Sequence, residues 1–272
     1  MSTIVVANMY RLMDLTNLED LKEKHEIKCQ ELKLRGSVLL ATEGFNASLA
    51  GTAEAIQAYE DFLHEDPRFA EVVVKKSFGT TIPFAKMVVR IKKHVLAWDL
   101  DFELSSDDYN KTKRLSPAQW RKMMERIGDD VILLDTRNDY EFAYGTFEGA
   151  EQLNLNTFKD FPKKFMEKYG DKKDKTFLTF CTGGIRCEKV TAFADRMGFD
   201  KVYQLEGGII SYFDELAGEK WKGSCYVFDY RWAIGPDKNE TGEGHYLEDG
   251  FKGTVHVIPE KAIQENAEKS WP

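Results

Sequence analysis

The chain has 272 residues, of which 42% are hydrophobic, and this is enough for two ordinary domain cores. Its 38 basic and 46 acidic residues give a net charge of −8, which argues against broad nucleic-acid affinity and against a DNA partner. No apolar run approaches the roughly 18 residues that span a membrane, and no basic and then hydrophobic leader is present, so a cytoplasmic protein without membrane contact is expected. The four cysteines, at positions 29, 181, 187 and 225, form no CxxC pair, so neither a metal site nor a disulfide framework is expected.

Residues 1–98 are predicted to form a ferredoxin-like α+β domain, because strand and helix patterns follow one another in split βαβ order. The expected elements are strands at 4–10, 37–41, 47–51 and 86–92, helices at 18–33 and 53–64, and an additional extended segment at 71–77. Between the second and third strands, residues 42–46 (Thr-Glu-Gly-Phe-Asn) suit a turn, and turn chemistry explains them as well as a function does.

A basic stretch lies near the end of this first domain. Residues 75–94 carry six positive charges and no Asp or Glu, namely Lys75, Lys76, Lys86, Arg90, Lys92 and Lys93. Such a cluster, interleaved with Phe78 and Phe84, is suited to an RNA backbone and an unpaired base. On the sequence alone, a solvated strand face is the favoured interpretation.

Residues 99–114, rich in Asp, Ser, Asn and Lys, are predicted to be a linker to a second domain at 115–222, and 223–272 are a C-terminal extension. Ser116, Pro117 and Gln119 are typical of a helix start. Strand, loop and helix patterns then alternate through 129–137, 176–180 and 201–205. This alternation predicts an α/β domain with a parallel sheet and helices on both faces, whose ligand site lies at the carboxyl ends of the strands.

A cysteine follows the apolar strand at 176–180 and opens a short glycine-bearing loop. The loop reads Cys181, Thr182, Gly183, Gly184, Ile185 and Arg186. Backbone N–H groups and the positive end of the following helix favour an anionic sulfur at Cys181, and Arg186 supplies a fixed positive charge. Such surroundings lower a cysteine pKa from about 8.5 to roughly 3.5–7.5 and make a nucleophilic thiolate. The competing interpretation is a buried structural cysteine.

Three neighbouring residues have open roles. Asp135 and Arg137 end the strand at 129–137, so they either support Cys181 at the same rim or form a salt bridge that ties loops together. Cys187 falls on an apolar helical stripe and is interpreted mainly as core, with resolution of an oxidised or persulfidated Cys181 as the alternative.

These motifs resemble a rhodanese domain. The resemblance rests on the strand end at Asp135, on the segment 148–150 (Glu-Gly-Ala), on the loop from Cys181 to Arg186 and on the exit 204–208 (Gln-Leu-Glu-Gly-Gly). It implies that the cysteine carries sulfur as a persulfide held by the loop amides. Gly145-Thr146-Phe147 stands where rhodaneses often have Gly-His-Ile, so any role of that histidine is absent. Cysteine phosphatases have a loop one residue longer, which is sized for a phosphoryl group. Phosphatase chemistry is therefore less favoured than the other interpretations of this site.

Over residues 1–232 the chain resembles the rhodanese-containing tRNA uridine hydroxylase family. Residues 42–46, 83–86, 116–120 and 224–229 carry this resemblance together with the Cys181 loop. It implies oxygen-dependent conversion of uridine 34 in the tRNA anticodon loop to 5-hydroxyuridine, with molecular oxygen as co-substrate and no other apparent cofactor. Two departures are that Phe45 stands where the family usually has Ile and that the cysteine-rich ending of many members is missing.

In this interpretation Cys181 is the thiolate or persulfide centre, Arg186 and the loop amides stabilise its sulfur, and the basic stretch holds the anticodon loop. A sulfur donor protein is a further partner that the resemblance allows. Two alternatives remain: a rhodanese-type sulfurtransferase that passes persulfide sulfur to a small molecule or protein, and a non-catalytic RNA-binding module.

Overall fold

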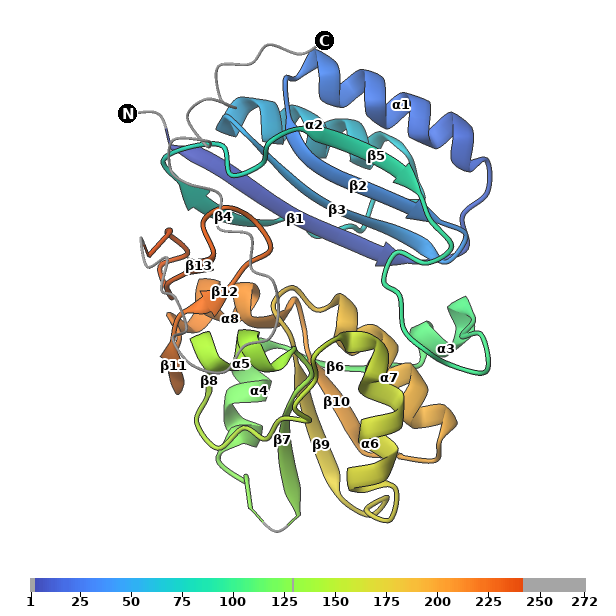
Figure 1. The fold of residues 1–272 in the computed structure, drawn as a ribbon, viewed down its shortest axis with the longest axis vertical. Coiled ribbons are helices and arrows are strands. Elements are labelled where there is room, and N and C mark those ends of the chain that lie inside the picture. The colour runs from blue at the N-terminus through green and yellow to red at the C-terminus, as the bar shows by residue number, and fades with distance from the viewer. Residues whose placement is uncertain (1–2, 129, 242–272) are drawn as a thin grey trace.

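The computed structural model describes residues 3–128 and 130–241, so the part of the C-terminal extension at 242–272 lies outside the described residues. Two units stack on one another, with the first above the second in Figure 1. Within the described ranges, no helix has the length and apolar character needed to cross a membrane.

The first unit is a five-stranded sheet covered by two helices on the face away from the second unit (Figure 1). Its strand order is β4-β1-β3-β2-β5, antiparallel except for the parallel pair of β2 and β5. The elements are β1 (Ile4–Leu12), α1 (Leu18–Glu31), β2 (Arg35–Ala41), β3 (Gly44–Gly51), α2 (Ala53–Glu65), β4 (Lys75–Gly79) and β5 (Met87–Ile91). The predicted ferredoxin-like fold is confirmed. Phe45, one of the family departures, is fully buried in the core and stacks on His25.

Two sequence predictions within this unit are wrong in detail. The strand that completes the split βαβ unit is β4, whereas the strand expected at 86–92 is β5, an added edge strand beside β2. Gly44 to Asn46 belong to β3, so only Thr42 and Glu43 form the turn. Gly44 is required by a close strand contact, because a Cβ there would lie 2.2 Å from the carbonyl oxygen of Arg11 on β1.

The second unit contains a four-stranded, all-parallel sheet in the order β6-β10-β9-β7. Helices α4 and α8 pack on one face of the sheet, and α6 and α7 pack on the other. The elements are α3 (Ser106–Asn110), β6 (Lys113–Leu115), α4 (Pro117–Met124), β7 (Val131–Asp135), α5 (Asp139–Tyr144), β8 (Gly145–Phe147), the 3-10 turn η1 (Phe158–Asp160), α6 (Phe161–Tyr169), β9 (Thr176–Phe180), α7 (Ile185–Arg196), β10 (Val202–Leu205) and α8 (Gly208–Leu216). The predicted α/β fold with helices on both faces is confirmed.

The segment predicted as a linker, 99–114, contains the short helix α3, and the edge strand β6 begins at its end. A strand of three residues carries too little alternation to be recognised in the sequence. It forms only because β10, almost ninety residues later, supplies the parallel partner for Lys113 to Leu115.

The C-terminal extension joins the two units. Strand β11 (Trp221–Gly223) pairs with β8, and the short strands β12 (Cys225–Tyr226) and β13 (Ala233–Ile234) pair with each other. Farther along, Arg231 donates to the hydroxyl of Ser77 at 2.9 Å and the amide of Phe78 donates to the carbonyl of Lys238 at 2.9 Å. The extension therefore fixes β4 of the first sheet against the second unit.

Candidate active site

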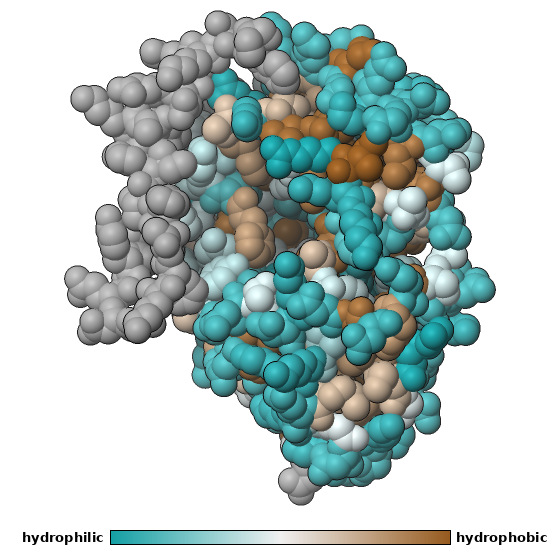
Figure 2. Space-filling model, turned by 45° about the vertical axis from the view of Figure 1, so that its right-hand side comes forward, coloured by the Kyte–Doolittle hydropathy of each residue, from teal (hydrophilic) through white to brown (hydrophobic). Residues whose placement is uncertain are grey.

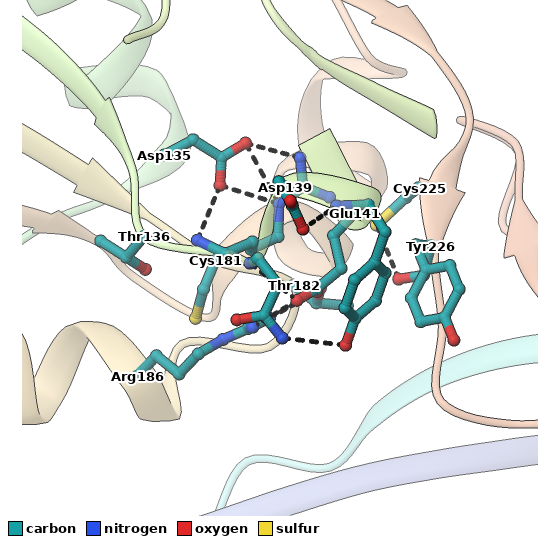
Figure 3. Close-up of polar contacts among 12 residues, drawn as sticks. Asp135, Thr136, Asp139, Glu141, Cys181, Thr182, Arg186, Cys225 and Tyr226 are labelled. Atoms are coloured by element: carbon teal, nitrogen blue, oxygen red, sulfur yellow. Dashed lines mark hydrogen bonds and ion pairs between the residues drawn. The ribbon is translucent and has the colours of Figure 1, made fainter. Parts of the chain in front are cut away.

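Cys181 lies where strand β9 ends and its loop leads directly into helix α7. The residue is buried, with 1% of its surface exposed, and the backbone N–H of Gly184 donates to its Sγ at 3.1 Å. Its sulfur points to the side on which Arg186 lies (Figure 3). Gly184 adopts φ +104, and a Cβ there would meet the hydroxyl of Tyr10 at 2.5 Å, so this position requires glycine. Thr182 and Gly183 are partly exposed in the loop, and Ile185 begins α7.

The surroundings of Cys181 hold its sulfur as an anion. Burial by itself would raise the thiol pKa. A hydrogen bond from the Cys187 thiol, the positive charge of Arg186 and the N–H groups of Cys187 and Gly184 outweigh burial and lower the pKa from 9.0 to about 6. At neutral pH the sulfur is therefore a thiolate, the nucleophilic form.

Cys187 is both a core residue and a direct partner of Cys181. It is fully buried in α7, as the apolar stripe predicts. Its thiol hydrogen-bonds to the Cys181 sulfur and lies 3.7 Å from the hydroxyl oxygen of Thr136. Burial, together with the neighbouring anionic sulfur, raises the pKa of Cys187 well above its usual value, so Cys187 stays protonated and donates.

Arg186 is held by a carboxylate that the sequence interpretation missed. The two terminal nitrogens of Arg186 donate to Glu141 on α5 at 2.6 and 2.7 Å (Figure 3), and Glu141 is fully buried. Burial opposes ionisation of Glu141, but the guanidinium lowers its pKa below the ordinary value. The available signal was the spacing of Asn138 and Glu141, a capping box that opens α5.

Asp135 and Arg137 lie at the same rim but bind each other. Their side chains are fully buried and pair at 2.6 Å, and the Arg137 guanidinium also donates to the carbonyl of Gly145 at 2.6 Å. Thr146 donates its hydroxyl to Asp135 at 2.9 Å. These contacts tie β7 to β8. Thr136 lies between them in sequence, and its hydroxyl oxygen lies 3.7 Å from the sulfur of Cys187.

The first unit packs its open sheet face onto the Cys181 loop and helix α7. The Tyr10 hydroxyl donates to Glu188 on α7 at 3.2 Å, and Arg114 pairs with the same carboxylate at 2.7 Å. Beside this contact, Glu43 accepts from the buried ammonium of Lys189 at 2.8 and 2.9 Å. Residues 42–46 therefore include a contact between domains that turn chemistry does not explain.

The six predicted RNA-binding residues do not lie on one strip. Strands β4 and β5 form opposite edges of the first sheet, so Lys75 and Lys76 are separated from the other four. Lys76 pairs with Glu60 at 2.7 Å, and Lys75 is buried against the second unit. The exposed members are Lys86, Arg90, Lys92 and Lys93. The stretch looks continuous in sequence because the chain crosses from one sheet edge to the other within it.

The surface is hollowed between the two units (Figure 2). A pocket at their boundary is lined by residues of both, among them Thr42, Glu43, His94, Glu103 and Tyr109. Across the described ranges, no three His, Cys, Asp or Glu side chains group in a way that could hold a metal ion.

Comparison with known proteins covers nearly the whole described chain. A family model described as the UPF0176 acylphosphatase-like domain matches residues 4–95, and a rhodanese-like domain model matches residues 116–215. The tRNA uridine(34) hydroxylase of Cupriavidus necator is 38% identical over 243 residues, covering 88% of this chain and 86% of its own. That of Thiobacillus denitrificans is 39% identical over 244 residues, covering 88% and 98%, and that of Legionella pneumophila strain Corby is 38% identical over 236 residues, covering 86% and 91%. The chain belongs to the tRNA uridine(34) hydroxylase family.

Proposed function

We propose that this protein hydroxylates uridine 34 of tRNA to 5-hydroxyuridine, with molecular oxygen as co-substrate and Cys181 as the reacting group. The observation that carries the proposal is the anionic Cys181 sulfur in a loop closed over by the first domain. A plain persulfide carrier needs only the second domain, whereas here Tyr10 and Glu43 of the first domain bind the helix that follows the loop. The names of the relatives supply the substrate and the position.

The chemistry assigned to Cys181 is nucleophilic attack. The anionic sulfur, which a low thiol pKa provides at neutral pH, adds to C6 of the uracil ring, and the electron pair of the C5–C6 double bond makes C5 nucleophilic toward oxygen. One atom of O2 enters the C5–OH group and the other leaves as water, which takes two electrons and two protons from an external reductant. Loss of the C5 proton then re-forms the double bond and releases the Cys181 thiolate. Arg186 and the Gly184 amide stabilise the sulfur anion before it adds to the ring and again when it leaves, since both are already in place around it. The persulfide form of Cys181 would be held by the same amides, and a sulfur donor protein is the partner proposed for that state.

The tRNA partner is proposed to bind through its anticodon loop. A wobble base is unpaired, so it can be turned out of the loop toward a recessed sulfur at small cost. The proposed contacts to the RNA backbone are the exposed cations on and near β5, namely Lys86, Arg90, Lys92 and Lys93. A tRNA substrate also makes the cytoplasm the proposed location of the protein.

Deletion of the gene tests the proposal. Nucleoside mass spectrometry of bulk tRNA should show loss of 5-hydroxyuridine, and wild-type protein should restore it while a Cys181→Ser copy should not. Cys29→Ala is the matched control, because Cys29 is buried in the first core and its pKa is raised to about 12 by burial. Unchanged 5-hydroxyuridine in the deletion strain, with thiocyanate formed rapidly from thiosulfate and cyanide by the purified protein, would instead identify a sulfurtransferase.

A further inference from the structure

Lys75 on β4 is a buried ammonium at the boundary between the two domains. Only 5% of its surface is exposed, and its Nζ lies 4.5 Å from the centre of the Tyr10 ring. Among the residues that the structure describes, no acidic side chain forms an ion pair with it. Burial of a charge is costly unless something compensates it, and a ring face alone compensates only part of that cost. The position of Lys75 therefore needs an explanation.

The stem of Lys75 crosses the two glycine turns that enclose the sulfur. A Cβ built on Gly183 would lie 4.0 Å from its Cε, and one built on Gly207 would lie 3.8 Å from its Cδ. The two turns are joined by backbone hydrogen bonds, because the amide of Ile209 donates to the carbonyl of Cys181 at 3.0 Å. Lys75 thus enters the site from the first domain, over the loop.

The neighbouring residue on β4 points the other way. Lys76 pairs with Glu60 on α2, which covers the outer face of the sheet. Successive side chains of a strand alternate between its faces, so Lys75 faces the second domain. A solvated strand face, the interpretation favoured from the sequence, fits Lys76 but not Lys75.

The charges around Lys75 explain why it is tolerated. Burial lowers its pKa to about 8, while the anions of Cys181 and Glu188 oppose that decrease. Attraction between two charges is reciprocal, so the ammonium in turn favours the anionic form of Cys181. Arg186, the other cation of the site, also favours the anionic sulfur, but it shares its charge with Glu141, to which it gives two hydrogen bonds.

We propose that Lys75 is a positioning residue of the Cys181 site, supplied by the first domain, whose ammonium holds the sulfur anionic. The reacting centre is then shared between the two domains. This inference deepens the proposed function and uses Cys181 as its reacting group, but its main test needs neither tRNA nor oxygen. The titratable and charged groups that face the sulfur and Lys75 from the elements packed against them are Tyr10, Arg114, Glu141, Arg186, Cys187 and Glu188.

The test is a pH titration of the thiolate ultraviolet absorbance in the full-length protein, with the Cys181→Ser curve subtracted. Loss of a nearby positive charge disfavours the anion, so Lys75→Met should move the Cys181 midpoint upward from near 6 by about one unit. Lys75→Arg keeps the charge and should move it less. Lys76→Met is the matched control and should leave the midpoint unchanged.

Affinity for tRNA separates this role from an RNA contact. Lys75→Met should bind unmodified tRNA with the wild-type dissociation constant and salt dependence, yet hydroxylate it more slowly below the shifted midpoint. A Lys75→Met midpoint that coincides with wild type overturns the proposal, whether tRNA affinity falls or not. If hydroxylation of tRNA is never observed but the midpoint shifts, the proposed function fails while the assignment of Lys75 stands.

Met is an apolar side chain of similar length, so replacement of this buried ammonium should leave the fold intact, which thermal denaturation would confirm. If Lys75→Met does not fold, Lys75→Gln provides the same titration. An unchanged midpoint in Lys75→Gln would overturn the assignment equally.

Discussion

The two domains differ in what they bury. The core of the first domain is formed by apolar side chains, with His25 as a neutral polar member bonded to Tyr59 at 2.8 Å. The second domain buries complete ion pairs, Asp135 with Arg137 and Glu141 with Arg186, at the carboxyl ends of β7 and β9. Buried charge is expensive and is retained where it fixes a site. The first domain is therefore mainly a scaffold. The charged side chains on its inner face influence the site where they contact the Cys181 loop of the second domain.

The largest expected difference between the domains concerns Glu141. Glu141→Gln leaves the Arg186 guanidinium buried without its counter-charge, which should cost about 3–5 kcal/mol of unfolding free energy. Urea denaturation of the full-length protein measures this change. Glu71→Gln, which removes the exposed partner of Arg11, is the control and should cost less than about 1 kcal/mol. Equal losses in the two variants would mean that the Glu141 pair is no more important than a surface pair.

A smaller effect is expected from His25 in the first domain. Burial lowers its pKa from 6.5 to about 4, so the folded protein binds the proton more weakly than the unfolded chain does. The stability contributed by neutral His25 is complete above pH 6.5 and is lost as pH falls toward about 4, and the loss is about 1–2 kcal/mol at pH 5.5.

His25→Phe should remove this part of the pH dependence, whatever its effect on stability at neutral pH. Urea midpoints of the two proteins, compared between pH 7 and about 4.5, provide the measurement. Parallel curves for wild type and variant would show that the pKa of His25 is the same in the folded and unfolded protein, which would contradict the lowered value.

Features set by adjacent residues were predictable, and features set by distant ones were not. The loop from Cys181 to Arg186 is contiguous, so its strand, glycines and helix start can be read directly. Glu141 is 45 positions from Arg186, and Tyr10 is 178 positions from Glu188, so sequence pattern alone does not bring them together. The basic stretch shows the opposite error, because neighbours in sequence lie on opposite edges of one sheet.

The same distinction holds for the fold. The split βαβ order identified the first domain, yet the identity of its fourth strand depended on which segment pairs with β1, and that segment is β4. The existence of strand β6 likewise depends on β10, which supplies its parallel partner. Asp135 and Arg137 form the salt bridge that the sequence left as one of two alternatives, whereas their further contacts to Gly145 and Thr146 on β8 are not contained in a strand pattern.

The central claim is that the fold holds the Cys181 sulfur as an anion at neutral pH. Its most direct test is the pH dependence of thiolate absorbance in the wild-type protein, corrected with Cys181→Ser. A midpoint near 6 is predicted, and a midpoint near the ordinary cysteine value of about 8.5 would contradict the claim.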